Sequence, residues 1–569
     1  MKLRTNRARI QIASLLALLI LLSACNPGPK YARPPAQTPS AFKEAVPQDY
    51  KEGEGWKIAQ PGDDKLRSKW WEVYADPQLN ALEEQVAVSN QSIAASEANF
   101  RSARALVVSA RSALFPAIGA STSYTNSKFS QTSRTTVVSG AGGANNTTTT
   151  GNTGSNSTTS SGGSTTTTTG GTSSGGTGVA GSSGIAGNIN NFSLPIDATY
   201  TVDLWHRVRN TIAVNSFQAQ ASAADVATAI LSTQAELAQD YFQIRALDAQ
   251  RKILDETLEN YRHSLDLTLI LFHTGINSEE EVSQAQTQLD TATVQATDIA
   301  VSRAQFEHAI AMLIGKPPAA FSLEVAAFVP KPPDVPLALP SELLERRPDI
   351  AAAERRVAAE NAQIGVARAA YYPNLTLSAS GGFQTANIAQ WFTWPSRFWS
   401  LGPQFAQTLL DFGARRAATE QAEATYDASV ANYRQTVLTV FQAVEDNLSA
   451  LRILSDEVVQ QRTAVGSANH YLDLSLTRFR AGVDSYLNVI TAQTTVLTSR
   501  EAEVTIQLRQ MTASVQLIMA LGGGWNASQL PQTKELIVKP PKWTPNGAAQ
   551  SVVPAAIAAP NPPPLTSQQ

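Results

Sequence analysis

Cysteine is almost absent from this chain, since Cys25 is the only one among 569 residues. A single cysteine excludes an internal disulfide and any metal site built from two cysteines. Charged residues are also scarce, at 16%, and the formal net charge is −3, so no basic excess predicts a nucleic-acid partner. No run of 18 or more apolar residues follows the first 22 positions, so the sequence predicts no helical membrane span. A passage through a membrane would have to rely on strands.

The motifs of enzymes are missing as well. No nucleophile with a neighbouring base, no phosphate-binding loop and no zinc motif occurs in the chain. There are five histidines, including His263, His273 and His470, and none has a partner four residues away as a helical metal site requires. We therefore predict a protein that is not an enzyme and that has neither a cofactor nor a metal site.

The first residues have the form of a lipoprotein signal peptide (residues 1–24). Four basic side chains precede the apolar run Ile10–Leu22, which is too short to span a bilayer. The run ends in Leu22-Ser23-Ala24-Cys25, which resembles the bacterial lipobox and implies cleavage before Cys25 and lipidation of that residue. Acyl chains anchor a protein through about 0.8 kcal/mol per buried methylene. The alternative is an ordinary signal peptide containing one small buried cysteine. Asn26, rather than aspartate, favours sorting to the outer membrane.

What the chain does contain is a repeat. The string LDLTLILFHTGINS (Leu265–Ser278) returns as LDLSLTRFRAGVDS (Leu472–Ser485), 207 residues later. Further upstream, Ser92–Ile118 matches Asp349–Leu375 at an offset of 257. The two offsets differ by 50, so the chain is a tandem duplication whose first copy carries about 50 extra residues. These lie in a Gly/Ser/Thr-rich segment, which has no charged or aromatic residue from Thr135 to Asn191 and is predicted as a loop over 134–191.

Each copy follows one plan of helix, two strands, long helix, turn and returning helix. A proline, Pro116 or Pro373, ends the first helix. The long helices begin at about Arg207 and Ala414, and the returning helices end at Gly315 and Gly522. The predicted divisions are a Pro-rich strap (25–77), repeat 1 (78–315, first helix Gln78–Leu114), a Pro-rich linker (316–340), repeat 2 (341–522, first helix Ser341–Ala370) and a Pro/Ala-rich tail (523–569).

Four strands are predicted per chain. Apolar and polar residues alternate with period two in most of them, as lipid outside and water inside would require, although a soluble sandwich would alternate too. Aromatic residues gather at both ends of the strands, which favours a membrane setting. Four strands cannot close a barrel, so the chain must oligomerise. The predicted strands are Ile118–Tyr124, Phe192–Leu204, Leu375–Gln384 and Trp399–Leu409.

Together these features resemble the TolC-like, NodT-type outer-membrane factor family, in the lipoprotein branch of resistance-nodulation-division (RND) efflux systems. The resemblance rests on the segments Arg346–Ser380, Arg478–Gln493 and Met519–Trp525 and on the lipobox, and it covers roughly residues 25–530. It implies an α+β membrane protein, a homotrimer with a 12-stranded β-barrel in the outer membrane. A long α-helical barrel with an equatorial domain would extend into the periplasm.

The resemblance gives the repeated turns (272–278 and 479–485) a role, since such tips dock on a periplasmic adaptor protein. The alternative is that their glycines only make a tight turn. The residues we assign to docking are Gly275, Ile276, Asn277, Gly482, Val483 and Asp484.

The family often carries aspartates that ring a closed pore after the second tip, but this chain has Asn488 and Thr491 there. We predict that Leu487 and Asn488 form the constriction and that Glu280 or Glu281, near Gln284, supplies a negative field. Alternatively, these glutamates only complement a helix dipole.

The predicted function is a passive duct, lipid-anchored in the outer membrane, that receives small toxic compounds from the adaptor and an inner-membrane RND-type pump. One alternative is an exit duct for secreted protein or metal ions. Another is a trimeric surface adhesin, against which the twice-repeated order of helix, strands and helix argues. The sequence does not name the substrate.

Overall fold

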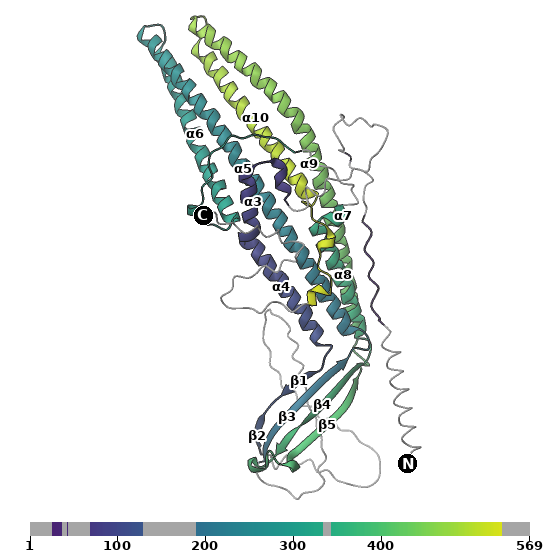
Figure 1. The fold of residues 1–569 in the computed structure, drawn as a ribbon. Coiled ribbons are helices and arrows are strands. Elements are labelled where there is room, and N and C mark those ends of the chain that lie inside the picture. Colours follow the sequence, from purple (N-terminus) through teal and green to yellow (C-terminus); the bar gives the residue numbers. More distant parts are fainter. Residues whose placement is uncertain (1–25, 37–42, 44–68, 129–188, 334–342, 538–569) are drawn as a thin grey trace, which may run out of the picture. The chain divides into compact units, whose positions relative to one another are not determined.

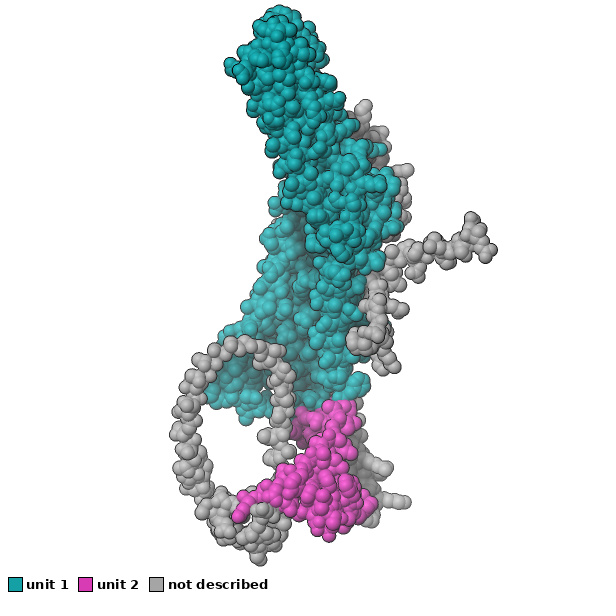
Figure 2. Space-filling view, turned by 90° about the vertical axis from the view of Figure 1, so that its left-hand side faces the viewer, with its two compact units in different colours: residues 1–115, 201–375, 405–569 teal, residues 116–200, 376–404 magenta. Residues whose placement is uncertain are grey.

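The computed structural model describes residues 26–36, 43, 69–128, 189–333 and 343–537 (Figure 1). The signal peptide, Cys25, most of the predicted 134–191 loop and the end of the tail lie outside these residues. The chain divides into two compact units (Figure 2). We call residues 1–115, 201–375 and 405–569 the helical unit, and residues 116–200 and 376–404 the strand unit.

The duplication is visible in the helix boundaries. Each of the three main helices of repeat 1 has a counterpart of equal length in repeat 2, at the same offsets that relate the sequences. The pairs are α4 (Gln91–Ser112) and α8 (Pro348–Ala369), with 22 residues each; α5 (Arg207–His273) and α9 (Ala414–Arg480), with 67 each; and α6 (Glu279–Leu313) and α10 (Tyr486–Ala520), with 35 each. The long helices begin and end within a few residues of the predicted positions and extend about 100 Å at 1.5 Å per residue.

The helices before the strands are broken where the sequence analysis predicted single helices. The segment 78–114 is α3 (Pro77–Ser89) followed by α4, and between them Asn90 is extended and caps α4 through its side chain. The segment 341–370 contains α7 (Leu343–Arg346) and α8, separated by Arg347, which is extended because Pro348 follows it. The returning helices end at Leu313 and Ala520, two residues before the predicted glycines.

A buried ion network holds the linker between the repeats. Arg245 and Asp248 of α5, each with a side chain only 3% exposed, are 3.2 Å apart. Arg303 of α6 donates to Asp248 over 2.7 Å and to the carbonyl of Leu323 over 2.7 Å. Arg245 also donates to the carbonyl of Glu324 over 2.7 Å. The predicted linker (316–340) is therefore fastened to the helices in its first half.

The predicted flanking straps are also packed in part. Trp70 and Trp71, in a short 3-10 helix η1 (Trp70–Tyr74), are buried in the largest core cluster of the helical unit. Leu536, in the predicted tail, is 1% exposed and packs with Phe100 and Val107 of α4. The proline-rich composition of the strap and the tail predicted extended chain. The apolar side chains of Trp70, Trp71 and Leu536 instead anchor parts of both segments in the core of the helical unit.

The strands form one antiparallel arrangement in the order β1–β3–β4–β5, and β2 also pairs with β3. The predicted strand 118–124 is broken into β1 and β2, and β3 begins three residues inside the predicted loop. The strand bounds are β1 (Ala117–Ala120), β2 (Ser123–Ser127), β3 (Ile189–Val202), β4 (Asn374–Thr385) and β5 (Arg397–Ala406).

One face of β5 carries large apolar side chains in the open. Trp399, Leu401 and Phe405 alternate with polar or small residues and are 82%, 75% and 66% exposed. Near the start of β5, Trp391 stacks on Phe392 with ring centroids 5.1 Å apart. The aromatic cluster predicted at this end of the strands is therefore present. Among the described residues, no helix is both long and apolar enough to cross a membrane.

Candidate docking tips and gate

The first tip joins α5 to α6. Gly275 has φ of +78°, and its amide donates to the carbonyl of Phe272 over 2.9 Å. The amide of Ile276 donates to Leu271 over 2.9 Å, so the last carbonyls of α5 are satisfied by the reversed chain. No atom lies within 4 Å of where a Cβ on Gly275 would be. Glycine is required here by the backbone conformation and not by any neighbour.

The second tip repeats this geometry. Gly482 has φ of +68°, its amide donates to Phe479 over 2.9 Å, and the amide of Val483 donates to Arg478 over 3.0 Å. A Cβ on Gly482 would also meet open space. The two turns are thus built alike although their sequences differ.

Each tip presents one apolar residue directly after its glycine. Ile276 and Val483 are each 69% exposed. Two equivalent exposed aliphatic side chains, held by rigid turns at the ends of long helices, are suited to insertion into a partner's surface.

The two tips differ in charge. At the second tip, Arg478 lies 3.2 Å from Asp484, which also accepts hydrogen bonds from the side chain of Asn488 and the amide of Ser485. The hydrogen bond from Asn488 is the main reason that the pKa of Asp484 lies below its usual value. The first tip has Leu271 and Asn277 in these positions. Arg478 was not predicted from the sequence, although its spacing of six residues from Asp484 across the turn indicates such a pair.

The predicted gate residues lie on the first two turns of α10. Leu487 is 58% exposed, and Asn488 and Thr491 are exposed beside it. Asn488 is already engaged by Asp484, and the hydroxyl of Thr491 donates to the carbonyl of Leu487 over 2.9 Å. This surface of α10 is therefore uncharged within one chain.

The glutamates of the first hairpin have local roles. Ser278 caps α6, and Glu281 completes a capping box by accepting from the Ser278 amide over 3.4 Å. Glu280 accepts from the side chain of Gln284 over 3.3 Å. Glu279, Glu280 and Glu281 all lie in the first turn of α6, where carboxylates complement the helix dipole, so the alternative interpretation accounts for all three.

Behind the tips the two hairpins pack on each other. Phe479, Tyr486 and Val489 are buried together with Ala285 of α6. Further along, the side chain of Gln493 donates to Ser264 over 2.9 Å in a buried position. Residues of both hairpins thus share one hydrophobic cluster directly behind the two tips.

At the opposite end of the long helices lies the described part of the strap (residues 26–36). Asn210, in the first turn of α5, donates to the side chain of Asn26 over 3.3 Å. Gly28 lies so close to Gly365 of α8 that a Cβ on it would come 2.9 Å from the Gly365 Cα. Cys25 itself lies outside the described residues, but the residue after it, Asn26, is held against the first turn of α5.

Comparisons with known proteins agree with this geometry. A family profile described as outer membrane efflux protein matches residues 82–316 and 339–523. The chain belongs to the outer membrane efflux protein family.

Relatives within this family resemble the chain along almost its whole length. The toluene efflux pump outer membrane protein TtgC of Pseudomonas putida is 29% identical, over 93% of this chain and 99% of its own. The pyoverdine export outer membrane protein OpmQ of Pseudomonas aeruginosa is 27% identical, over 91% and 97%. The solved outer-membrane channel OprN has 26% identity and a TM-score of 0.71, covering 88% of this chain and all of its own.

The family resemblance, the channel fold and the location in the outer membrane predicted from the sequence are confirmed by these matches. The family is one of efflux channels and not of enzymes. The adhesin alternative is therefore wrong. Within the part of the chain that the structure describes, no three His, Cys, Asp or Glu side chains gather as a metal ion would need.

Proposed function

We propose that three copies of this chain form the exit duct of a tripartite efflux system. The duct receives small toxic organic compounds from a periplasmic adaptor and an inner-membrane RND-type pump and releases them outside the cell. The observation that carries this proposal is the pair of equivalent tips, each with an exposed aliphatic residue on a glycine turn. A channel that worked alone would have no need of two matched exposed aliphatic residues at the ends of its two 67-residue helices.

The membrane end supports the same proposal. The exposed apolar face of β5 suits lipid, and three chains would bring enough strands to close the sheet that one chain leaves open. Asn26, the residue after Cys25, accepts a hydrogen bond from Asn210 in the first turn of α5. A lipid on Cys25 would anchor the chain to the membrane.

At the periplasmic end, Leu487 and Asn488 would narrow the pore, with Thr491 one turn further in. The charge that cations would meet comes from Glu280 and Glu281 beside Gln284, because Asp484 is neutralised by Arg478.

The names of the relatives indicate only the chemical class of the compounds that the duct carries. The printed names of relatives mention toluene, antibiotics and pyoverdine, all of them organic molecules. Nothing in the described residues favours secreted protein or metal ions over these.

A growth-inhibition panel tests the proposal. Deletion of the chain should lower resistance to at least one class among organic drugs, detergents and solvents, and the wild-type chain should restore it. Resistance unchanged for every class, in a strain without a second exit duct, would refute the proposal.

The docking role needs a variant that leaves the turns intact. Because bulky residues at Gly275 or Gly482 would strain a positive φ, the sharper change is Ile276→Glu with Val483→Glu. This variant should assemble in the outer membrane but fail to restore resistance. The matched control exchanges the aliphatic residues, Ile276→Val with Val483→Ile, and should restore it. Full resistance in cells with the glutamate variant would show that the two tips are not part of the docking surface.

The gate is tested in planar bilayers. Glu280→Gln with Glu281→Gln removes two charges but keeps the capping box, since glutamine serves at that position as well. The reversal potential in a salt gradient should move toward that of an unselective pore. An unchanged reversal potential would leave both glutamates with the helix-capping role alone.

A further inference from the structure

The charges at the two ends of the strands are balanced differently. At one end the chain passes from β3 to α5 and from β5 to α9, and arginines there have carboxylate partners. Arg209, after β3, lies 3.9 Å from Asp203, and Arg415, after β5, lies 2.5 Å from Asp411. The positive charges at this end are therefore neutralised by the chain itself.

The opposite end of the strands holds the turn between β4 and β5 (residues 386–396) and the end of β2 (Figure 1). Arg397, the first residue of β5, is the only charged residue between Pro373 and Asp411. Within the described part of the chain, neither Arg397 nor Lys128, which directly follows β2, forms an ion pair. The cations at this end are thus left for a partner outside the chain.

The turn before β5 is held by its own hydrogen bonds. The hydroxyls of Thr393 and Ser396 both donate to the carbonyl of Gln390 over 2.7 Å. The amide of Arg397 donates to the carbonyl of Trp394, and the Arg397 guanidinium lies over the Trp394 ring. The ring positions the guanidinium from one side, and the N–H groups of the guanidinium stay available to an acceptor.

Aromatic rings join this turn to three strands. Trp391 stacks on Phe392, whose ring centroid lies 5.6 Å from that of Phe383 on β4. Trp391 also lies 5.6 Å from Phe192 on β3, and Phe192 lies 4.7 Å from Tyr124 on β2. Rings of this kind concentrate where a membrane meets water. The unpaired cations therefore lie at an end of the strands that has the composition of a membrane interface.

The face of β5 that carries Arg397 is otherwise apolar. Side chains two residues apart share one face of a strand, so Arg397 lies in line with the exposed Trp399, Leu401 and Phe405. At about 3.3 Å per residue, Leu401 lies roughly 13 Å along the strand from Arg397, and the hydrocarbon of one leaflet is about 15 Å thick. A cation followed by an apolar stripe of this length matches an amphiphile with an anionic head group.

We propose that Arg397, held against Trp394, binds the phosphate group of a lipid in the outer leaflet of the outer membrane. The acyl chains of this lipid lie against Trp399 and Leu401. Arginine suits the role because its planar guanidinium donates two parallel hydrogen bonds to one phosphate. Lys128 attracts the same class of lipid at the opposite edge of the sheet. The inference rests on the membrane setting of the strands in the proposed function and adds the lipid chemistry that they select.

Lipid binding to the purified full chain in a neutral detergent tests the site. The probes are phosphatidic acid and diacylglycerol, which has the same acyl chains without the phosphate, and native mass spectrometry counts the bound lipids. The wild-type chain should bind phosphatidic acid about tenfold more tightly than diacylglycerol, as a charge-assisted hydrogen bond predicts. Equal binding of the two lipids by the wild-type chain would overturn the proposal.

Two substitutions locate the phosphate at Arg397. Arg397→Gln should remove most of the preference for phosphatidic acid. Arg397→Lys should retain part of it, because lysine keeps the charge without the planar group of donors. An undiminished preference in Arg397→Gln would refute the site at the start of β5.

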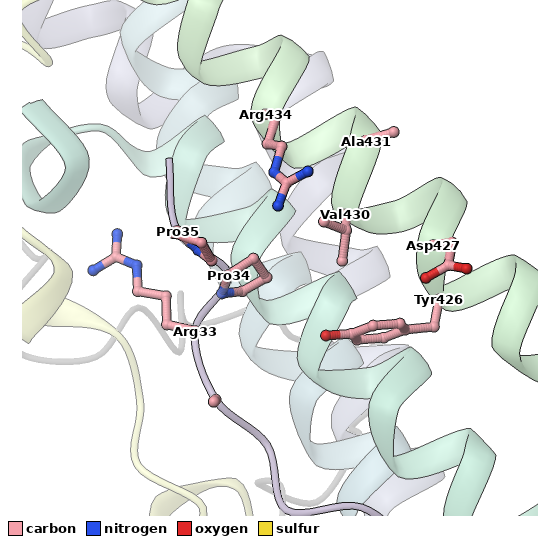
Figure 3. A pocket seen from close by; sticks show the side chains of 9 residues that line it. Arg33, Pro34, Pro35, Tyr426, Asp427, Val430, Ala431 and Arg434 are labelled. Carbon is pink, nitrogen blue, oxygen red and sulfur yellow. The ribbon is translucent and has the colours of Figure 1, made fainter. Parts of the chain in front are cut away.

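Arg434 provides a matched control outside the strands. It is an exposed arginine of α9 that lines a hollow of about 560 Å³ together with Asp427 and residues 32–35 of the strap (Figure 3). Arg434→Gln removes the same charge and should leave the preference for phosphatidic acid unchanged. A loss as large as that in Arg397→Gln would show that net charge attracts the lipid, and would contradict a specific site.

Inorganic phosphate separates a lipid site from a site for the free anion. An excess of inorganic phosphate should not displace phosphatidic acid, because burial of the acyl chains contributes to binding. Displacement by inorganic phosphate would overturn the assignment to a lipid.

The growth-inhibition panel separates failure of the lipid site from failure of the proposed function. A chain that restores resistance but shows no preference for phosphatidic acid would refute the lipid site and leave the duct standing. A chain that restores no resistance would refute the duct, whichever lipid it binds.

Discussion

Asn90 donates from its side-chain Nδ2 to the carbonyl oxygen of Leu313 over 2.8 Å, which ties the start of α4 to the end of α6. Its counterpart in repeat 2, Arg347, donates over 2.8 Å to the carbonyl of Ala520, the counterpart of Leu313. Two different side chains thus satisfy equivalent helix-end carbonyls. The duplication has kept this junction while its chemistry changed.

Replacement of Asn90 should destabilise the helical unit in two separable steps. Its Oδ1 caps α4 by accepting from the amides of Ser92 and Ile93. Asn90→Ala should cost about 1–2 kcal/mol for the cap and about 1 kcal/mol for the bond to Leu313. Asn90→Ser keeps a capping oxygen and should lose only the second part. Melting midpoints in detergent should therefore fall in the order wild type, serine, alanine, and equal midpoints for the two variants would contradict this.

Gly522 should tolerate no side chain. It has φ of +95°, and a Cβ there would lie 2.1 Å from the carbonyl oxygen of Arg346. Gly522→Ala should lower the melting midpoint clearly, with about 1–2 kcal/mol from the left-handed conformation before the clash is counted. Gly466, inside α9 with open space around it, is the control, because Gly466→Ala should stabilise by up to about 1 kcal/mol. Similar shifts of the melting midpoint for Gly522→Ala and Gly466→Ala would contradict the close approach of Gly522 to the carbonyl of Arg346.

Glu83 should make stability fall as the pH rises. It is fully buried on α3, neither carboxylate oxygen has a partner, and burial raises its pKa well above the usual 4.5. Below pH 4.5 the carboxyl group of Glu83 is protonated in both the folded and the unfolded chain. Above pH 4.5 the unfolded chain releases this proton while the folded chain keeps it. The free energy of unfolding therefore falls with rising pH until the pH reaches the raised pKa of the folded chain.

Glu83→Gln removes this titration. The variant should melt higher than wild type at pH 7, and the difference should shrink toward pH 4. If the melting midpoint of the wild-type chain instead fell relative to that of the variant as the pH is lowered from 7 to 4, the pH dependence would have the opposite sign. That result would contradict the burial of a neutral carboxyl group at Glu83.

His206 should be replaceable by glycine with a gain in stability. It precedes α5 with φ of +58°, where the equivalent residue before α9 is Gly413 with φ of +96°. Relief of the left-handed conformation should contribute about 1 kcal/mol. The reverse change, Gly413→His, should cost a similar amount. A lower melting midpoint for His206→Gly would show that the bond of its ring to Arg209 matters more than backbone strain.

The sequence predicted the long helices and the tips within a few residues, because the duplication marks both copies and glycine marks the turns. It missed the break at Asn90, since the helical pattern continues on both sides of a residue that serves equally well as a cap. It missed the network of Arg245, Asp248 and Arg303, because charges that meet across helices have no fixed spacing along the chain. The burial of Leu536 was hidden for the same reason, since the buried residues of its cluster lie more than 300 residues away along the chain.

The most direct test of the account is the rate at which energised cells expel a fluorescent organic substrate of their pump. Cells without this chain should retain the dye, the wild-type chain should restore rapid efflux, and the Ile276→Glu, Val483→Glu chain should not, although it reaches the outer membrane as a trimer. Equal efflux with and without the chain, in a strain that has no second exit duct, would contradict the proposal that this protein is the outer-membrane exit of an efflux pump.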